Sequence, residues 1–357
     1  MASIAKRPDG RWRARYRDDG GKEHAKHFPR KIDAQRWLDS VTASFVRGDY
    51  VDPQAGSISL RDFYNAWASR QVWAMGTRSA MDLAIGSFPN LPLRRLRRSD
   101  VELWVKGMDQ SGLAPGTIHT RVQNVRAVLR AAVADNLIAK DPSAGVALPR
   151  RRRREASMSI PPPEVVGRLM DATQHAPLIA VCAFAGLRLG EAAALKPEDL
   201  DVEARTLAVR RQVQRGPAAT VEIKSPKAGS ERVVFIPESL VTLLEKHLDS
   251  TARTEWMFAD DGQLPPHQNT VGHWWRSACK TVGVSYRLHD LRHFYASGLI
   301  AAGCDVVTVQ RALGHARATT TLDTYSHLWP TAEDRTRKAA GELLADSLRT
   351  ARGLHAI

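Results

Sequence analysis

The chain has 357 residues, of which 43% are hydrophobic, and its mean hydropathy of −0.33 fits two or three globular domains. No apolar run approaches the roughly 18–20 residues of a membrane span, and the N-terminus has no apolar signal region, so we expect neither a membrane protein nor a secreted one. The three cysteines, Cys182, Cys279 and Cys304, are odd in number and far apart, as in reduced cytoplasmic proteins.

The charge is strongly positive and unevenly distributed. The net charge is +14, with a pI of about 10.1. Residues 1–156 contain 29 Lys and Arg against 16 Asp and Glu, whereas residues 157–357 contain 23 against 22. A strongly basic first part followed by a nearly neutral second part indicates that the first part binds a phosphate backbone, so nucleic acid is the expected partner. The alternative is a solvated basic face that has no partner.

Residues 1–52 predict a small sheet backed by a helix. In "GRWRARYRDDGGKEHAKHF" the period of two predicts a strand, "DDGG" a hairpin turn, and "KEHAKHF" a returning strand. The apolar spacing of "RKIDAQRWLDSVTASFVRG" then predicts a helix that ends at Gly48. The arginines on one face of the sheet are candidates for a DNA groove: Arg11, Arg13, Arg15 and Arg17. The same pattern also describes any small β-β-α module.

Residues 57–149 predict an all-helical block. Its helices are expected in "SLRDFYNAWASRQ", "RSDVELWVKGMD" and "APGTIHTRVQNVRAVLRAAVADNLI". In the last segment one face is apolar, and Arg121, Arg126 and Arg130 lie on the other. The run "RRRRR" that begins with Arg150, Arg151 and Arg152 opens a basic linker at 150–160, and these arginines are further candidates for DNA contact.

Residues 161–357 predict a mixed, mainly α-helical block with a small antiparallel sheet. A buried helix, "APLIAVCAFAG", precedes "LRLGEAAALKPEDLD". The strands are expected in "TLAVRRQVQ", "ATVEIKS" and "ERVVFIP", and "KSPKAGSER" between the last two is expected to form a hairpin that carries Lys224 and Lys227. Helices follow to the end of the chain.

Several polar residues of this block could perform chemistry, although each has an ordinary alternative. Arg188 and Glu191 at i and i+3 share a helical face, which is also common for surface pairs. His289 and Arg292 likewise share a face, His315 follows Gly314 at a probable helix end, and Tyr325 lies ten residues later. A lone histidine is more often structural, and a lone tyrosine is more often a surface aromatic.

A metal site is not expected. His289 and His293 have the i, i+4 spacing of two zinc ligands, but the glutamate of HExxH is absent and no cysteine lies at ligand spacing.

Together these residues suit transfer of a DNA phosphodiester. Two arginines can clamp the non-bridging oxygens and neutralise charge in the pentavalent transition state. A lysine can protonate the departing 5′-oxygen, and two histidines can hold or relay protons. A tyrosine hydroxyl is a poor nucleophile until nearby cations favour the phenolate. Its attack would give a 3′-phosphotyrosine and a free 5′-hydroxyl, with no cofactor, metal or nucleotide required.

The motifs "GLRLGE", "LHDLRHFYASGL" and "LGHARATTTLDTYSHL", in that order, resemble the signature of tyrosine recombinases, in particular the lambda-type integrases of phages and mobile elements. The resemblance implies an arm-site-binding domain over 1–52, a helical SAM-like core-binding domain over 57–149 and a catalytic domain over 161–357. It implies these catalytic residues: Arg188, Lys227, His289, Arg292, His315 and Tyr325. Lys224 is the alternative to Lys227, and Glu191 matches an acidic residue that braces the arginines.

The resemblance also implies partners. Attachment sites in double-stranded DNA would be bound by a synaptic tetramer, and strands would be exchanged in two steps through a Holliday junction. The amphipathic "TAEDRTRKAAGELLADSL" would dock on a neighbouring subunit, its alternative being to pack on its own domain. A directionality factor and a host DNA-bending protein stay open as accessory partners.

Three other functions compete with an integrase. A DNA-binding regulator of the same fold would no longer cut DNA, and a type IB topoisomerase would use similar chemistry without synapsis. A chromosome-dimer resolvase would usually lack the block at 1–52. The complete catalytic set and the basic N-terminal blocks favour the integrase.

Overall fold

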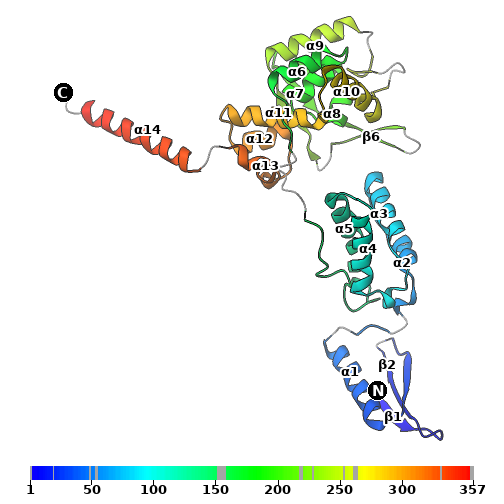
Figure 1. Cartoon of the computed structure of the whole chain (residues 1–357). Helices are drawn as coiled ribbons and strands as arrows, with labels where there is room; N and C mark the ends of the chain where they lie inside the picture. The colour runs from blue at the N-terminus through cyan, green and yellow to red at the C-terminus, as the bar shows by residue number, and fades with distance from the viewer. Residues whose placement is uncertain are drawn as a thin grey trace. The chain divides into compact units, whose positions relative to one another are not determined.

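The computed structural model describes residues 2–353 except 19, 48–49, 53–54, 151–157, 217–219, 227–228, 252–253, 260–263 and 330–331. The chain divides into two compact units, Met1–Arg151 and Arg152–Ile357, and the division falls inside the predicted linker (Figure 1). The first unit contains both the predicted sheet block and the predicted helical block. No helix among the described residues is both long and apolar enough to cross a membrane.

The first unit begins with a three-stranded antiparallel sheet in the order β1-β2-β3. Its strands are β1 (Ser3–Lys6), β2 (Trp12–Arg17) and β3 (Glu23–Phe28), and α1 (Lys31–Arg47) packs against it. The alternation along β2 turns Ala14 and Tyr16 toward α1, where they are buried with Ala34 and Leu38. The predicted strands and helix are confirmed, and β1 was not predicted because the short "SIAK" has no alternation to distinguish it.

The helical part contains α2 (Leu60–Ala68), α3 (Met75–Ser87), α4 (Arg98–Gln110) and α5 (Pro115–Ala134), with short 3-10 turns η1 (Ala55–Ser57) and η2 (Leu93–Arg95). The predicted apolar face of α5 is fully buried at Ile118, Val122, Val125, Val128 and Leu129. Helix α3 was not predicted, because two glycines weaken the helical preference of "MGTRSAMDLAIGS". Packing of α3 on α5 overrides that preference.

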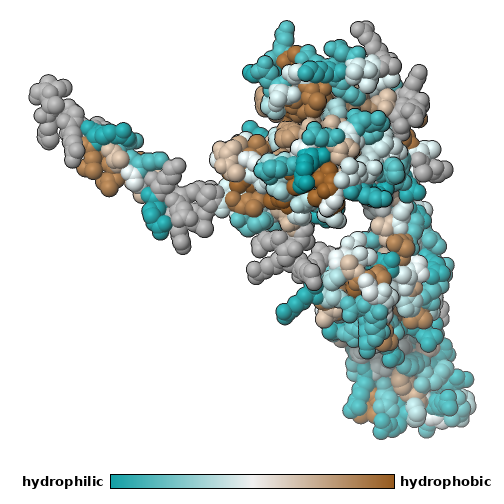
Figure 2. Space-filling view, turned by 45° about the horizontal axis from the view of Figure 1, so that its top comes forward, coloured by the Kyte–Doolittle hydropathy of each residue, from teal (hydrophilic) through white to brown (hydrophobic). Residues whose placement is uncertain are grey.

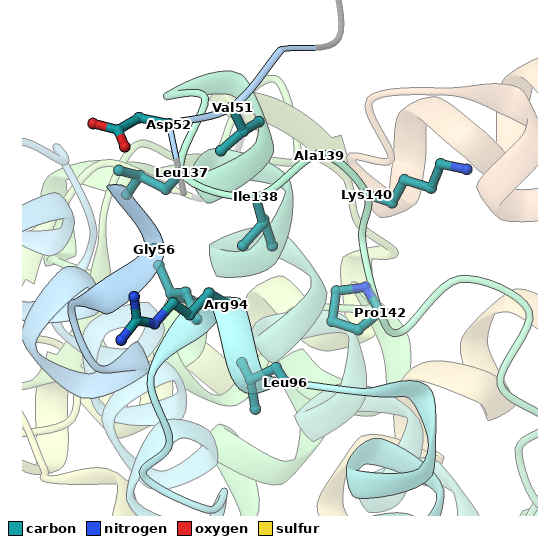
Figure 3. Close-up of a pocket in the computed structure, with 11 residues that line it drawn as sticks. Val51, Asp52, Gly56, Arg94, Leu96, Leu137, Ile138, Ala139, Lys140 and Pro142 are labelled. Atoms are coloured by element: carbon teal, nitrogen blue, oxygen red, sulfur yellow. The ribbon is translucent and has the colours of Figure 1, made fainter. Parts of the chain in front are cut away.

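The segment between α1 and α2, which is described at residues 50–52 and 55–59 and is called the connector here, packs onto this helical part. Gly56 is buried, and a Cβ there would lie 2.7 Å from the carbonyl oxygen of Leu137 and 3.0 Å from the Cβ of Arg94. A pocket of about 290 Å³ opens beside it, lined by connector residues and by the segment after α5 (Figure 3). Glycine at position 56 therefore allows the connector to lie directly against the helical part.

The second unit is mainly helical around one large core. Its long helices are α6 (Pro163–Asp171), α7 (Ala176–Phe184), α9 (Glu238–Ser250), α10 (Gln268–Val282) and α11 (Leu288–Ala301). Helix α7 is the buried centre, contacted by α6, α9 and α11. Shorter elements follow these: α8 (Leu189–Ala193), η4 (Pro197–Asp199), α12 (Val306–Leu313), α13 (Ala318–Tyr325) and η7 (Ser326–Leu328). The predicted fold class is confirmed.

The strands of this unit form two small antiparallel sheets. One has the order β4 (Leu200–Asp201), β5 (Thr206–Val209), β8 (Arg232–Phe235), and the other pairs β6 (Gln212–Arg215) with β7 (Val221–Lys224). The predicted hairpin between β7 and β8 is therefore wrong: β7 pairs with β6 and β8 pairs with β5. The sequence prediction missed this because "TLAVRRQVQ" is two strands, one in each sheet.

The chain ends in α14 (Ala332–Gly353). Leu343, Leu344 and Leu348 are exposed on it, with 52–69% of their surface accessible. Figure 2 shows apolar and polar surface on different sides of this helix, as the amphipathic sequence predicts.

Candidate active site

A cavity of about 390 Å³ in the second unit collects residues from segments far apart in the sequence. Five of the six residues predicted to be catalytic line it: Arg188, His289, Arg292, His315 and Tyr325. The sixth, Lys227, lies outside the described residues. The other lining residues are Met158, Arg287, His293, Thr320 and Thr324. The cavity therefore combines two predicted arginines, two predicted histidines and the predicted nucleophile.

Arg188 is placed by the tight turn that precedes α8. Gly186 has a left-handed φ of +64°, and a Cβ there would lie 2.3 Å from the Cδ1 atom of Tyr295. Arg188 then caps α8, and the Glu191 carboxylate accepts hydrogen bonds from the Arg188 backbone N–H at 2.9 Å and from its Nη1 at 2.6 Å. The turn and the cap together fix the direction in which Arg188 enters the cavity.

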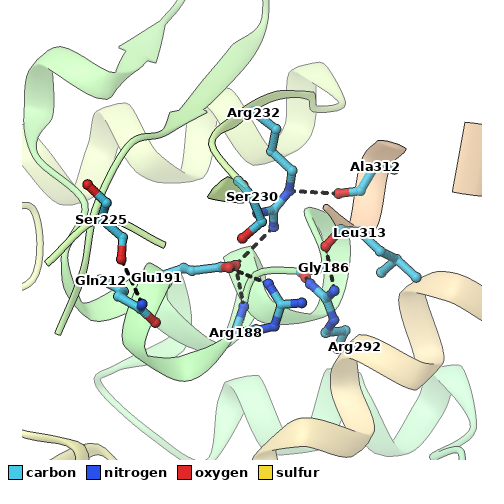
Figure 4. Close-up of polar contacts among 10 residues, drawn as sticks. All are labelled: Gly186, Arg188, Glu191, Gln212, Ser225, Ser230, Arg232, Arg292, Ala312 and Leu313. Carbon is cyan, nitrogen blue, oxygen red and sulfur yellow. Dashed lines mark hydrogen bonds and ion pairs between the residues drawn. The ribbon is translucent and has the colours of Figure 1, made fainter. Parts of the chain in front are cut away.

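Glu191 also binds a second arginine, from β8 (Figure 4). Arg232 donates to the Glu191 carboxylate at 2.9 Å and to the carbonyl of Ala312 at 3.0 Å. Burial alone would raise the pKa of Glu191, but the hydrogen bond from Arg232 and the charges of Arg232 and Arg188 hold that pKa below its usual value. An ionised carboxylate thus links α8, β8 and the end of α12.

Arg292 is the most deeply buried cation of the cavity, with 2% of its surface exposed. Its guanidinium donates to the carbonyl of Gly186 at 2.5 Å and to the carbonyl of Leu313, so it joins the turn before α8 to the end of α12 (Figure 4). Burial, and then the charge of Arg188, lower the pKa of Arg292 to about 9. Arg292 is therefore still a cation at neutral pH, and a guanidinium has more N–H donors than these two carbonyls use.

The two predicted histidines are held neutral in the free protein. His289 lines the cavity and keeps part of its surface exposed, but burial, and then the charges of His293 and Arg292, lower its pKa to about 4. Burial and the charges of Arg292 and Arg188 lower the pKa of His315 to about 4 as well. His315 follows Gly314, which ends α12 with a left-handed φ of +63°, and its Nδ1 lies 2.9 Å from the Thr321 hydroxyl.

Tyr325 is buried at the end of α13, with 1% of its surface exposed, and it is not the surface aromatic of the alternative interpretation. Its hydroxyl lies 2.8 Å from Nδ1 of His293. Burial raises the pKa of Tyr325 to about 12, although Arg292 and Arg188 act in the opposite direction. The two arginines therefore favour the phenolate, as the sequence analysis expects of nearby cations, but in the free protein desolvation outweighs them.

The alternative lysine ends β7. The Nζ atom of Lys224 lies 2.6 Å from the Glu222 carboxylate, and its side chain is 45% exposed. The described structure therefore places Lys224 in an ion pair on the smaller sheet.

The arginines predicted to bind DNA belong to the first unit, except Arg152, and those that the structure describes differ in their surroundings. On β2, Arg13, Arg15 and Arg17 all lie within 4.0 Å of the Glu23 carboxylate, and Arg11 precedes the strand in an exposed position. The side chains of the three arginines on that strand are 42–63% exposed. The predicted arginine face is present, and one carboxylate partly neutralises it.

The predicted DNA-binding arginines of the helical part and the linker differ more from one another in exposure and hydrogen bonding. Arg126 donates to the carbonyls of Ser143 and Val146, so its guanidinium supports the loop after α5. Arg121 is half-buried on α5, and Arg150 is exposed. Arg151 and Arg152 lie outside the described residues.

One group of possible metal ligands is present among the described residues, and it belongs to the first unit. The ligand atoms of Asp18, His24 and Asp52 lie within 4.8 Å of one another. These groups already bind one another and Lys22: His24 Nε2 lies 2.8 Å from Asp18, and Lys22 donates to Asp52 at 2.8 Å.

Comparison with protein families identifies the chain. Residues 162–331 match the model of the phage integrase family, and residues 2–47 match that of the phage integrase N-terminal domain. The chain belongs to the tyrosine recombinases of the phage integrase family. The recombinase is 24% identical to a XerC-like tyrosine recombinase of Caldanaerobacter subterraneus subsp. tengcongensis, over 88% of this chain and 90% of the relative.

Solved structures show the same fold. The recombinase is similar to the Tn1549 transposon integrase in complex with a circular intermediate DNA, with a TM-score of 0.69 and 19% identity over 80% of this chain and 99% of that one. It is also similar to the lambda integrase, solved as a tetramer bound to a Holliday junction, with a TM-score of 0.60 and 18% identity over 92% and 94% of the two chains. The protein is a tyrosine site-specific recombinase, and the phosphotyrosine route is general to its family.

Sequence reasoning did not select two residues of the site. Arg232 lies in the predicted strand "ERVVFIP" and was not selected from it, because its bond to Glu191 spans 41 residues and no sequence period operates over that separation. His293 was considered only as half of a zinc site. The sequence did contain one signal for His293: it is adjacent to Arg292, in the predicted helix that already carries two candidate catalytic residues.

Proposed function

We propose that this recombinase is the integrase of a phage or mobile element, and that Tyr325 is the nucleophile that joins it to DNA. The observation that carries the proposal is the convergence of five predicted catalytic residues on one cavity of about 390 Å³. Integration, and excision by the reverse reaction, would both use this site.

The catalytic steps follow from the groups that line the cavity. Arg188 and Arg292 bind the non-bridging oxygens of the scissile phosphodiester and stabilise the charge of the pentavalent transition state. The Tyr325 oxygen attacks phosphorus, and the bond from phosphorus to the 5′-oxygen breaks. Lys227 gives its proton to that 5′-oxygen, which leaves a 3′-phosphotyrosine and a free 5′-hydroxyl. In rejoining, a 5′-hydroxyl attacks the phosphotyrosine and the lysine takes a proton back.

The histidines suit hydrogen bonding to the phosphate. His289 and His315 are neutral in the free protein because burial and nearby cations disfavour the imidazolium. A neutral imidazole can donate one N–H to a phosphate oxygen. An incoming phosphate brings negative charge beside both rings, which raises their pKa values and favours that donation.

DNA binding in this proposal is divided between the sheet part of the first unit and its helical part with the linker that follows. The face of β2 with Arg13, Arg15 and Arg17, together with Arg11, contacts arm-type sites, and Arg121, Arg126 and Arg150–Arg152 contact core sites. Arg126 is the residue of this set least suited to bind DNA, because its guanidinium already donates hydrogen bonds within the protein. The relatives solved with DNA support a DNA partner for this chain.

Assembly follows the lambda integrase, which was solved as a tetramer on a Holliday junction. We propose the same synaptic tetramer here, with α14 docking on a neighbouring subunit. The exposed Leu343, Leu344 and Leu348 support this docking because an apolar helix face needs a partner surface. A directionality factor and a host DNA-bending protein would then act on this assembly, and the location would be the bacterial nucleoid.

Covalent capture tests the proposal. The purified protein is mixed with fragmented genomic DNA of its host, the mixture is denatured, and DNA that stays attached to protein is sequenced beside a Tyr325→Phe control. Adducts that map to one locus and vanish in the variant support the integrase and also identify the attachment site. Adducts scattered over the genome would indicate a topoisomerase. Tight binding to one site without an adduct, even on a nicked suicide substrate, would indicate a regulator that no longer cuts.

A further inference from the structure

Among the described residues, His293 is the hydrogen-bond partner of the Tyr325 hydroxyl, the proposed nucleophile. The Tyr325 oxygen lies 2.8 Å from Nδ1 of His293, and the two rings meet at 66° with their centroids 5.6 Å apart. Both side chains line the cavity that holds Arg188 and Arg292. The hydroxyl proton is therefore within transfer distance of a ring nitrogen at the point where the phosphate would bind.

His293 has the chemical state that a proton acceptor requires. Burial is the main cause that lowers the pKa of His293, with the charges of Arg287 and Arg292 acting in the same direction and that of Asp290 opposing them. The ring is thus neutral at neutral pH. A neutral imidazole has one bare nitrogen, and the buried Tyr325 hydroxyl, whose pKa is raised, is a donor rather than an acceptor of the proton. The consistent arrangement has Tyr325 donating to Nδ1 of His293.

The packing of α11 and α13 positions His293 and Tyr325 relative to each other. His293 lies on α11 directly after Arg292, whose guanidinium is fixed by the carbonyls of Gly186 and Leu313. Tyr325 is the last residue of α13 and packs with Ala296 and Ile300, which are also on α11. The same helix therefore positions an arginine for the phosphate and a histidine for the nucleophile.

Resting on the function proposed above, we infer that His293 is a further catalytic residue of this recombinase: its Nδ1 takes the hydroxyl proton as the Tyr325 oxygen attacks phosphorus. The O–H bond breaks as the phosphorus–oxygen bond forms, and His293 becomes an imidazolium beside the new phosphotyrosine. The leaving 5′-oxygen receives its proton separately, from Lys227. During rejoining, His293 returns its proton to the departing phenolate, so the two proton transfers balance over one cycle.

The alternative is that His293 only holds the ring of Tyr325. The variant His293→Asn separates the two roles, because the Oδ1 atom of asparagine can accept the same hydrogen bond near the Nδ1 position but is far too weak a base to take the proton. His293→Ala removes both roles. His327→Asn is the matched control, since His327 lies two residues after Tyr325, is exposed, and does not line the cavity.

The experiment measures the rate of covalent adduct formation on the attachment site found by capture, using two substrates. One is ordinary DNA, and the other has sulfur in place of the scissile 5′-oxygen, so that the leaving thiolate needs no proton. Lys227→Ala should be slow on the oxygen substrate and restored on the sulfur substrate. His293→Asn should be about 100-fold or more slower than the wild type on both, because loss of a general base typically costs 10²–10⁴-fold. Thermal unfolding and DNA binding of each variant verify its fold.

A His293→Asn rate within tenfold of the wild type on the sulfur substrate would overturn the inference and leave His293 as a holding residue. If the asparagine variant is unstable, His293→Ala is assayed with and without added imidazole: restoration supports proton transfer to His293, and no restoration contradicts it. If the wild type itself forms no adduct, the proposed function fails instead, and the two failures are thereby distinguished.

Discussion

The guanidinium of Arg232 donates a 2.9 Å hydrogen bond to the carboxylate of Glu191, although the two residues lie 41 positions apart. Both side chains are almost fully buried, at 6% and 1% exposure. The same carboxylate holds Arg188, so one negative charge positions two arginines beside the cavity. The geometry of the proposed phosphate clamp thus depends on a residue that does not line the cavity itself.

Replacing this carboxylate should therefore affect both stability and cleavage. Glu191→Gln leaves the buried Arg232 without its counter-charge, and we expect the free energy of unfolding to fall by about 3 kcal/mol. Adduct formation should slow because Arg188 loses its anchor. The control is Glu198→Gln, which removes a carboxylate that is 64% exposed and pairs with Arg211; it should change the free energy of unfolding by less than about 1 kcal/mol. Equal losses in the two variants, measured by denaturant unfolding, would contradict this account.

The turn at Gly186 should tolerate no side chain. Gly186→Ala places a Cβ 2.3 Å from the Tyr295 ring in a left-handed conformation, and we expect a loss of more than about 2 kcal/mol. Gly283→Ala is a matched control, because Gly283 has a φ of +75° with no atom within 4 Å of an added Cβ, and its loss should stay near 1 kcal/mol. Chemical denaturation of both variants tests the difference, and a Gly186→Ala variant as stable as Gly283→Ala would refute the crowding argument.

Part of the candidate site could be predicted from the sequence, and part of it could not. Arg188 with Glu191, and His289 with Arg292, are separated by three residues on a helix, so local periodicity predicts that they share a face. The bond between Arg232 and Glu191 and the contact between His293 and Tyr325 depend on how α8, β8, α11 and α13 pack, and no local pattern encodes that packing.

The neutral histidines predict a pH dependence of stability. His289 and His315 have pKa values of about 4 in the folded protein, against about 6.5 in an unfolded chain. Between these values the unfolded chain binds more protons, so the free energy of unfolding should fall as the pH falls from about 6.5 toward 4. His315→Gln should reduce this fall, whereas replacement of the exposed His327 by Gln should not. Denaturant midpoints measured across this range would contradict the account if they stayed constant or rose toward acid pH.

Glu23 should weaken the proposed arm-site contact. Its carboxylate lies within 4.0 Å of Arg13, Arg15 and Arg17, where it opposes a DNA phosphate. Glu23→Gln should therefore tighten binding to arm-type DNA and steepen the plot of log K against log salt by up to about 0.9. Asp39→Asn removes the same charge from the exposed surface of α1 and should change little. Filter-binding titrations at several salt concentrations test this, and unchanged or weaker binding by Glu23→Gln would argue against a DNA contact on this face.

Some elements of the fold could be predicted from the sequence, and others were missed. Strand β2, helix α5 and the buried helix α7 have strong periodicity or long apolar runs, and they appear where expected. Helix α3 and the pairing of β7 were missed because glycines weaken one pattern and because strand pairing is a long-range property. The raised pKa of Tyr325 could not be predicted, because the sequence shows which cations are present but not how deeply the hydroxyl is buried.

The most direct test of the account is to identify the amino acid that carries the DNA. The trapped covalent complex is digested with nuclease and trypsin, and the modified peptide is sequenced by mass spectrometry. The account predicts a nucleotide on the peptide that follows Arg317, whose one tyrosine is Tyr325. A nucleotide on any other residue, or an adduct that persists in Tyr325→Phe, would contradict the assignment of Tyr325 as the nucleophile.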